Sequence, residues 1–269
     1  MLSPAKTFSG SVPANYDQYM GPLFFEQYAQ DLAARIDKGK VQQALEIACG
    51  TGRVTTHLRN ALPAAATLIA TDLNPGMLEV AKQKTAIENI QYQVADAQEL
   101  SFADDSFDVV VCQFGFMFVP DKPKAFSEAY RVLRPGGMLL FNTWDAIEHN
   151  PLSKTVTDVV SAFFPGTGAA NFYTIPFSMH DREAIMQWLQ EAGFSTIHIE
   201  QVTKQPTSAH ASDGARGLIL GTPVFHAINE IDTTAPEKVI ALATEKIAAL
   251  YGDNPSTSEM NAWVAEAWK

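Results

Sequence analysis

The sequence predicts a doubly wound α/β fold, in which helices cover both faces of a mostly parallel sheet. Between residues 44 and 143, short apolar segments of strand length alternate with segments of helical periodicity. The segment Asp108–Gln113 (DVVVCQ) is almost entirely apolar, which is typical of a strand buried on both faces. Helical segments of about ten residues between such strands indicate βαβ units with right-handed crossovers.

Several of the predicted elements have recognisable ends. The strands are expected at 44–48, 67–72, 90–94, 108–113 and 138–143, and the intervening helices at 54–62, 75–84 and 123–133. Pro63 stops the first of these helices, and Arg134-Pro135-Gly136-Gly137 stops the third and turns the chain into the next strand. Before the sheet, apolar residues recur at helical spacing from Tyr16 to Ile36, and Gly21-Pro22 predicts a break in that helix.

The regular alternation breaks after Trp144, where residues 145–180 contain three prolines and several aromatic side chains. It resumes with a helix at 181–192 closed by Gly193, a strand at 196–202, a largely helical stretch at 206–259 and a strand-like run at 260–268. We therefore expect one domain with a core at 37–144, 181–205 and 260–269 and lid segments at 145–180 and 206–259. Because ligands of open α/β sheets bind outside the carboxyl ends of the strands, the lid segments should cover that crevice.

The charge balance argues against nucleic acid as a partner. The chain has 19 Lys and Arg against 30 Asp and Glu, a formal net charge of −11, whereas a phosphate-binding surface needs a basic face. Met1 to Gly21 lacks the apolar stretch of a signal peptide, and no run reaches the roughly 18 apolar residues of a membrane span. Cys49 and Cys112 end apolar runs and should be buried and reduced. We expect a cytoplasmic protein without membrane insertion, and the sequence leaves its oligomeric state open.

The segment most informative about chemistry runs from Leu45 to Arg53, with the sequence LEIACGTGR. It places a strand, a glycine-containing turn and the start of a helix in succession. Glycines let a backbone approach a ligand closely, and the first N–H groups of a helix carry a positive partial charge. The turn therefore predicts a ligand site, although a tight turn without a ligand would use the same residues.

Asp72 ends the second strand, 22 residues after Gly50. In an open α/β sheet this position faces the crevice, where a carboxylate accepts both hydroxyl protons of a ribose. The alternative is an N-cap for the helix that starts at Pro75, a role that Asn74 would also fill. Together with the glycine turn, Asp72 favours ribose binding.

Two further strand ends extend the pattern. Asp96 and Ala97 follow the third strand, where they would read the amine and ring edge of an adenine or form an ordinary solvated loop. Gln113 ends the fourth strand, and the backbone of Phe114-Gly115-Phe116 after it would approach the amino-acid end of a ligand. Simple aromatic packing is the alternative for these phenylalanines.

These elements, at these spacings, closely resemble the class I methyltransferases, in particular the group similar to the ubiquinone and menaquinone biosynthesis enzymes. The resemblance covers residues 44–143 and is carried by LEIACGTGRVT, ATDLNPGML, VADAQELSFADDSFDVVVCQ and RVLRPGGMLLF. It implies a Rossmann-like sheet of seven strands with a reversed last strand, and S-adenosylmethionine lying across the ends of strands one, two and four. One departure is Ala48, where the fullest form of the motif has glycine.

The resemblance also implies a set of cofactor-binding residues. Beside the methionyl portion it places Glu46, Ala48, Gly50, Thr51, Gly52, Arg53 and Gln113. Along the adenosine it places Asp72 on the ribose, Leu73 and Met77 beside it, and Asp96 and Ala97 at the adenine. The leading helix of the family folds over the cofactor and corresponds to the helix of Tyr16 and Tyr19, for which ordinary packing is the alternative.

The reaction would be an SN2 displacement from the sulfonium methyl group to a small-molecule acceptor, with the protein supplying alignment and exclusion of water. A base is needed only where the acceptor must first lose a proton. His149 and His180 flank the irregular segment after the fifth strand and are the candidates for that base, with a surface role as the alternative. None of the six histidines shows a metal-ligand spacing, so we expect no metal site.

Two other classes of protein share part of this pattern. A dinucleotide-dependent oxidoreductase would show G-x-G-x-x-G, but Thr55 stands where the third glycine would be. A non-catalytic S-adenosylmethionine-binding module would differ by a lid that leaves no access for an acceptor. Within the methyltransferases, the sequence after the fourth strand is not the Asn-Pro-Pro-Tyr type that marks methylation of adenine or glutamine amino groups. The aromatic residues within 160–180 favour a small, partly apolar acceptor, or simple lid packing.

Overall fold

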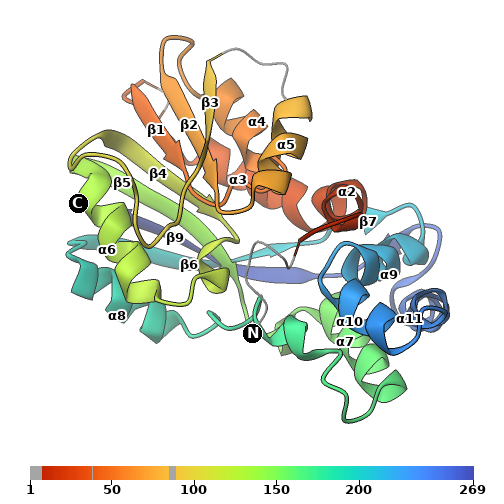
Figure 1. Cartoon of the computed structure of the whole chain (residues 1–269). Helices are drawn as coiled ribbons and strands as arrows, with labels where there is room; N and C mark the ends of the chain where they lie inside the picture. The colour runs from red at the N-terminus through yellow and green to blue at the C-terminus, as the bar shows by residue number, and fades with distance from the viewer. Residues whose placement is uncertain (1–7, 38, 85–88) are drawn as a thin grey trace. The chain divides into compact units, whose positions relative to one another are not determined.

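The computed structural model describes residues 8–37, 39–84 and 89–269, which divide into two compact units. The sheet unit holds Tyr28–Asp145, Met179–Val202 and Ala262–Lys269. The helical unit holds the described part of Met1–Gln27 together with Ala146–Ser178 and Thr203–Asn261. Figure 1 shows the helices and strands of both units.

The sheet unit is built on seven strands in the order β3-β2-β1-β4-β5-β9-β6. Their bounds are β1 Gln43–Glu46, β2 Thr67–Asp72, β3 Ile90–Val94, β4 Phe107–Gln113, β5 Leu133–Trp144, β6 Thr196–Lys204 and β9 Met260–Trp268. Neighbouring strands from β1 to β5 pair in parallel, and β9 runs antiparallel to β5. The prediction of a mostly parallel seven-stranded sheet with a reversed last strand is confirmed.

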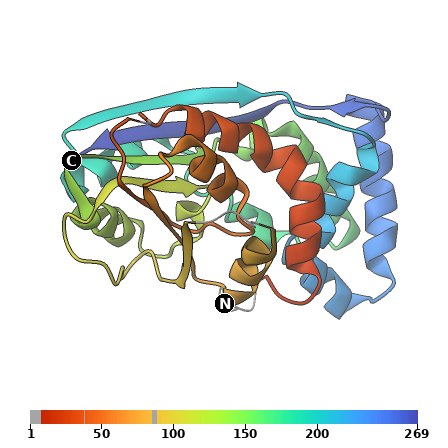
Figure 2. The same ribbon diagram turned by 90° about the horizontal axis from the view of Figure 1, so that it is seen from above.

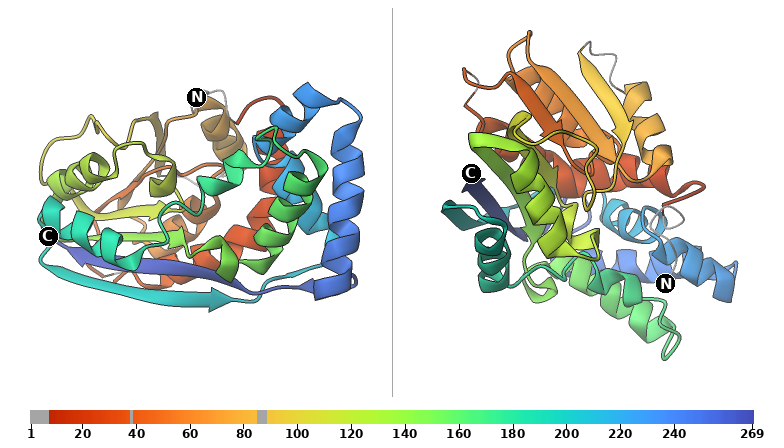
Figure 3. Two further views of the ribbon diagram at one scale, coloured as in Figure 1. Left: turned by 90° about the horizontal axis from the view of Figure 1, so that it is seen from below. Right: turned by 60° about the vertical axis from the view of Figure 1, so that its left-hand side comes forward.

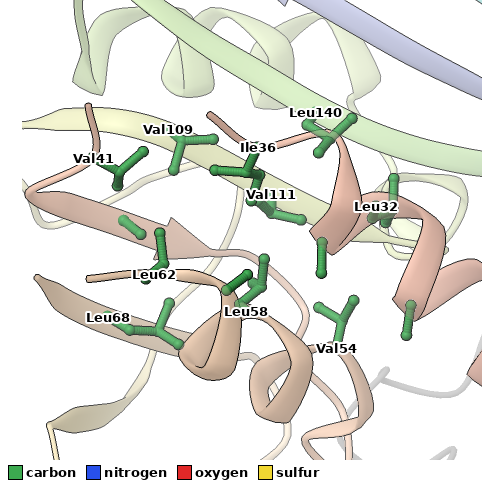
Figure 4. Close-up of a cluster of buried hydrophobic side chains, with 14 of the residues drawn as sticks. Leu32, Ile36, Val41, Val54, Leu58, Leu62, Leu68, Val109, Val111 and Leu140 are labelled. Atoms are coloured by element: carbon green, nitrogen blue, oxygen red, sulfur yellow. The ribbon is translucent and has the colours of Figure 1, made fainter. Parts of the chain in front are cut away.

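Helices cover both faces of this sheet, because alternate side chains of each strand point to opposite sides. On one face α3 (Glu26–Ala34) and α4 (Arg53–Ala61) pack against Val109 and Val111 of β4 (Figure 4). On the other face Phe126 of α6 (Lys122–Val132) contacts Phe141 of β5, with ring centroids 5.3 Å apart. Helix α8 (Arg182–Ala192) lies beside α6, as Figure 3 shows. The remaining helices of this unit are α5 (Pro75–Lys84) and a 3₁₀ turn at Phe116–Phe118.

The ends of α8 illustrate how the sequence specifies these helices. The carboxylate of Asp181 accepts hydrogen bonds from the backbone N–H groups of Glu183 and Ala184 at the N-terminus. Gly193 closes the C-terminus with a φ of +109°, and a Cβ there would lie 2.9 Å from the Tyr130 ring. The predicted glycine C-cap is confirmed, and no other residue would fit as well.

The helical unit is organised around α9 (Ala211–Leu220). Its other elements are α2 Val12–Asn15, a π-helix at Tyr16–Phe25, α7 Pro151–Phe163, α10 Val224–Ile231, α11 Ala235–Tyr251, 3₁₀ turns at Ile147–His149 and Asn171–Thr174, and the paired strands β7 Thr207–Ser208 and β8 Ser256–Thr257. Glycines on α9 allow close packing: a Cβ at Gly214 would lie 3.3 Å from Leu152, and one at Gly217 would lie 3.2 Å from Met20. Helix α11 lies alongside α9, as Figure 1 and Figure 2 show.

The predicted break at Gly21-Pro22 is wrong. Helical backbone runs without interruption through the π-helix, which contains Pro22, and continues into α3. The N–H of Glu26 donates to the carbonyl oxygen of Gly21, five residues earlier. A proline ring clashes with the carbonyl four residues before it in an α-helix, and the wider π-helical turn relieves that clash.

Two other segments are more regular than the sequence suggested. Within 145–180 lies α7, which begins at Pro151, a residue suited to the first helical position because no N–H partner is needed there. Arg134-Pro135-Gly136-Gly137 does stop α6, but it lies inside β5 as an irregular start of the strand.

Cys49 and Cys112 are free and buried, as predicted. None of the helices in the described ranges has both the length and the apolar character needed to cross a membrane.

Candidate active site

Four strands of the sheet unit carry polar side chains at or near their carboxyl ends, and these side chains share one face. Gln113 of β4 lies two residues beyond the register partner of Glu46 in β1, and Gln113 is itself in register with Asn142 of β5. Asp72 lies two residues beyond Ala70, the partner of Glu46 in β2. Because side chains alternate along a strand, all four project to the same side. The carboxyl ends of the parallel strands thus bring together a row of polar groups.

Asp72 connects the end of β2 to the glycine turn after β1. Its Oδ2 accepts a hydrogen bond from the N–H of Gly50 at 2.8 Å, and its Oδ1 accepts one from the N–H of Asn74 at 2.8 Å. Asn74, and not Asp72, caps α5, since its Oδ1 accepts from the N–H of Gly76 at 2.8 Å. The carboxylate expected to face only a ligand therefore also orders the loop.

Two carboxyl groups of this row resist ionisation. The pKa of Glu46 is raised to about 8, mainly by burial and to a smaller extent by the nearby charge of Asp72, against the Thr55 hydroxyl group, which lowers it. Burial also raises the pKa of Asp72, against the two backbone hydrogen bonds that lower it. No positively charged side chain contributes to either shift, and Glu46 Oε2 has no hydrogen-bond partner within the described ranges. A positively charged group bound here would stabilise both carboxylates.

The glycine turn leaves room for a ligand at one of its two glycines. Gly50 has a φ of +57°, and a Cβ there would meet nothing within 4 Å. Gly52 has a φ of +79°, but a Cβ there would lie 3.1 Å from the Cβ of Ala81 on α5. Open space therefore borders Gly50, whereas Gly52 serves the close packing of α4 on α5. Thr51 between them is buried, and Arg53 begins α4.

The ends of β2 and β3 carry apolar side chains that a flat ring would cover. Leu73 is 41% exposed and Val94 is 51% exposed, whereas Met77 of α5 is buried. Asp96 uses its Oδ1 within its own turn, where it accepts from the N–H of Gln98 at 2.9 Å. Ala97 is buried. At this corner Leu73 can make apolar contacts with a ligand, and the carboxylate of Asp96 already accepts a hydrogen bond within its own turn.

The exit of β4 is a compact aromatic corner. Phe114 has a φ of +51°, and its ring stacks on that of Trp144 with centroids 3.9 Å apart. The ring of Tyr28 meets both edge-on. Gln113, just before Phe114, is half-buried. The ring of Phe114 is therefore held between rings from α3 and β5.

The remaining predicted residues divide between the two units. Tyr16 and Tyr19 lie in the π-helix of the helical unit, where the Tyr16 ring stacks on Phe25 with centroids 5.1 Å apart. His149 lies in the helical unit and His180 in the sheet unit, and both side chains are exposed. Of the predicted site residues, those at the strand ends are the ones that the sheet unit brings together.

The buried polar groups without a hydrogen-bond partner within the described residues include two that sequence reasoning missed. One is Nδ2 of Asn142, which is fully buried in β5, and the other is Nε2 of His226 in α10. Asn142 interrupts the apolar run MLLF near the carboxyl end of its strand, and that interruption was the available signal. His226 carries no comparable signal in the sequence.

Comparison with known proteins identifies the class. Residues 45–141 match the family model described as a methyltransferase domain. The chain superimposes on a phosphoethanolamine N-methyltransferase from Haemonchus contortus with a TM-score of 0.61 at 20% identity, covering 96% of this chain and 57% of that one. It superimposes on the YcgJ protein from Bacillus subtilis with a TM-score of 0.59 at 20% identity, covering 90% and 98%. The fold is that of the S-adenosylmethionine-dependent methyltransferases.

Sequence similarity narrows the class to a family. A demethylmenaquinone methyltransferase from Staphylococcus epidermidis is 38% identical over 218 residues, which cover 74% of this chain and 88% of that protein. The ubiquinone/menaquinone biosynthesis C-methyltransferase UbiE from Klebsiella pneumoniae is 30% identical over 216 residues, covering 74% and 86%. The chain belongs to the family of these methyltransferases.

Proposed function

We propose that this methyltransferase transfers a methyl group to a ring carbon of a quinol-type small molecule. The proposal is supported by the two relatives just described, whose names specify demethylmenaquinone and C-methylation in ubiquinone and menaquinone biosynthesis. The similarity extends over most of the length of both relatives. A quinol ring is also a partly apolar acceptor, as the aromatic residues within 160–180 favour.

We place the cofactor across the ends of β1, β2 and β4. The observation that carries this placement is the pair of carboxyl groups with raised pKa beside the open space at Gly50. A ligand with an ammonium or sulfonium group complements Glu46, and a ribose fits beside Asp72, whose oxygens retain lone pairs for its hydroxyl groups. Leu73 and Met77 would contact the adenosine, Asp96 and Ala97 the adenine, and Gln113 the methionyl portion together with Ala48, Thr51, Gly52 and Arg53.

Bound S-adenosylmethionine supplies an electrophilic methyl group, so the protein must align the acceptor carbon and exclude water. A ring carbon of a quinol becomes nucleophilic when a ring hydroxyl group loses its proton, and a base would accept that proton. His149 and His180 remain candidates for this base. His226 joins them, because its buried Nε2 has no hydrogen-bond partner within the described residues.

We also propose that 145–180 and 206–259, with the π-helix of Tyr16 and Tyr19, form the lid over the acceptor. Apart from Asp145, Met179 and His180, which lie in the sheet unit, these segments belong to the helical unit. Ligands of open α/β sheets bind beyond the strand ends, where such a lid would close. A lid of this kind would supply the apolar surroundings that a quinol ring requires.

The test is a turnover assay with radiolabelled S-adenosylmethionine and three acceptors: a short-chain demethylmenaquinol, a ubiquinol precursor that lacks the ring methyl group, and phosphoethanolamine. Mass spectrometry of the product should show one added methyl group on a ring carbon of a quinol. Transfer to phosphoethanolamine alone would contradict the proposal. Calorimetry with S-adenosylhomocysteine and with NAD tests the cofactor separately, and only the former should bind.

A further inference from the structure

The polar side chain of Asn142 does not contribute to the stability of β5 in a way that would explain its presence there. Its Oδ1 accepts a hydrogen bond from the N–H of Phe114 at 3.0 Å, and its buried Nδ2 has no hydrogen-bond partner in the described part of the chain. The amide orientation is fixed, because a flipped amide would set Nδ2 against the N–H of Phe114. An unsatisfied buried amide costs free energy, and a β-branched apolar residue would suit this fully buried strand position better.

The residue that Asn142 holds has an unusual backbone. Phe114 has a φ of +51°, a region that bulky residues rarely adopt and that persists only where the surroundings impose it. Its N–H also reaches the backbone oxygen of Asn142 at 3.2 Å. Loss of the amide would therefore leave this N–H with a partner but remove the side-chain restraint on Phe114.

The restraint extends to the glycine turn through Gly115. A Cβ at Gly115 would lie 2.5 Å from the Cβ of Ala48 and 2.7 Å from Sγ of Cys112, so the exit of β4 is in close contact with the start of the turn. Ala48 is itself left-handed, with a φ of +54°. Any shift at Phe114 would be passed to Ala48 and from there to Gly50, because these atoms have no space to absorb it.

We propose that Asn142 is a positioning residue: from β5 it holds the exit of β4 in the conformation that keeps the glycine turn ready to bind the cofactor. The inference rests on the proposed placement of the cofactor at that turn. The unsatisfied amide lowers the stability of the sheet at this position, and its hydrogen bond to Phe114 makes the backbone of the site more rigid.

The variant Asn142→Val tests this role. Valine is β-branched, close to asparagine in size, and leaves the backbone bond to Phe114 in place. We expect an unchanged or higher Tm together with about tenfold weaker binding of S-adenosylhomocysteine, the loss that corresponds to one hydrogen bond. The matched control is Thr143→Val, which removes a second buried polar atom without a partner in the described ranges, from the neighbouring residue and the opposite face of β5. It should also keep or raise Tm, and it should leave the affinity within about twofold of wild type.

Two results would overturn the inference. One is a lower Tm or a failure to fold for Asn142→Val, which would make the side chain a structural one. The other is an equal loss of affinity in both variants, or in neither. If the wild-type protein does not bind S-adenosylhomocysteine, the proposed cofactor site is wrong, and this inference fails with it. Titration of the wild-type protein alone distinguishes that outcome from the two above.

Discussion

Asp72 holds Gly50 by a hydrogen bond of 2.8 Å from the glycine N–H to the carboxylate. The bond joins the end of β2 to the turn after β1. One side chain therefore both orders the turn and offers its remaining lone pairs to a ligand. Its removal should affect binding and stability together.

Asp72→Ala should weaken the binding of S-adenosylhomocysteine and lower the free energy of unfolding. The loss of a charged acceptor at the ribose predicts about 10- to 150-fold weaker binding. The N–H groups of Gly50 and Asn74 lose their partner as well, which should cost about 1–3 kcal/mol of stability. Calorimetry and thermal melting measure the two effects. Asn74→Ala is the control, since it should remove the cap of α5 at about 1 kcal/mol and leave the affinity unchanged. Unchanged binding by Asp72→Ala would exclude the ribose contact.

Glu46 should make the stability of the ligand-free protein depend on pH. Its folded pKa of about 8 lies above the ordinary value of 4.5, so between these values the folded state binds more protons than the unfolded state. The free energy of unfolding should then decrease as the pH rises from about 4.5 to about 8, by up to about 1.4 kcal/mol per pH unit from this group. Glu46→Gln should flatten that part of the profile in denaturant titrations. An unchanged slope would show that Glu46 is already ionised in the fold.

Cofactor binding should release a proton from the same group near neutral pH. A bound ammonium or sulfonium group favours the ionised form of Glu46, so S-adenosylmethionine should bind more tightly as the pH rises towards 8. Calorimetry at pH 7 in buffers of different ionisation enthalpy measures the released proton. Glu46→Gln should release fewer protons, and equal release by both proteins would assign the proton to another group.

Gly50 and Gly52 should respond differently to alanine. Both have positive φ values, so each substitution should cost about 1–2 kcal/mol of backbone strain. In Gly52→Ala the new methyl group also lies 3.1 Å from Ala81, which should lower Tm further. In Gly50→Ala the methyl group enters the open space beside the turn, and binding of S-adenosylhomocysteine should fall by about tenfold or more. If Gly50→Ala binds as wild type does, the ligand does not occupy that space.

Activity should survive chelation. Among the described residues, no group of three or more His, Cys, Asp and Glu side chains could hold a metal ion, and the reaction itself needs only an aligned acceptor and a base. The rate of methyl transfer to the quinol acceptor in EDTA should equal the rate without it. Loss of activity that added Mg²⁺ restores would contradict this prediction.

Local sequence patterns accounted for most of the fold, because strand and helix periodicity and end signals act over a few residues. The strands at 67–72, 90–94 and 260–268 have the predicted bounds, and the caps of α8 at Asp181 and Gly193 follow from side-chain and backbone geometry within one turn. The family resemblance added the reversed last strand, which the local pattern does not contain. The same locality explains the error at Pro22, since the local rule expects a proline to break an α-helix, whereas here the proline lies in a π-helical turn.

The chemistry of the strand ends was decided by tertiary structure. The sequence by itself determined which residues stand at the ends of the strands, and Glu46, Asp72 and Gln113 were predicted there. It did not determine the pKa of Glu46, because desolvation depends on everything packed around the carboxyl group. Nor did it determine the bond from Phe114 to Asn142, which spans 28 residues and forms only once β4 and β5 are in register. Side chains separated by this much chain acquire partners only through the sheet, so their roles are visible only in the folded molecule.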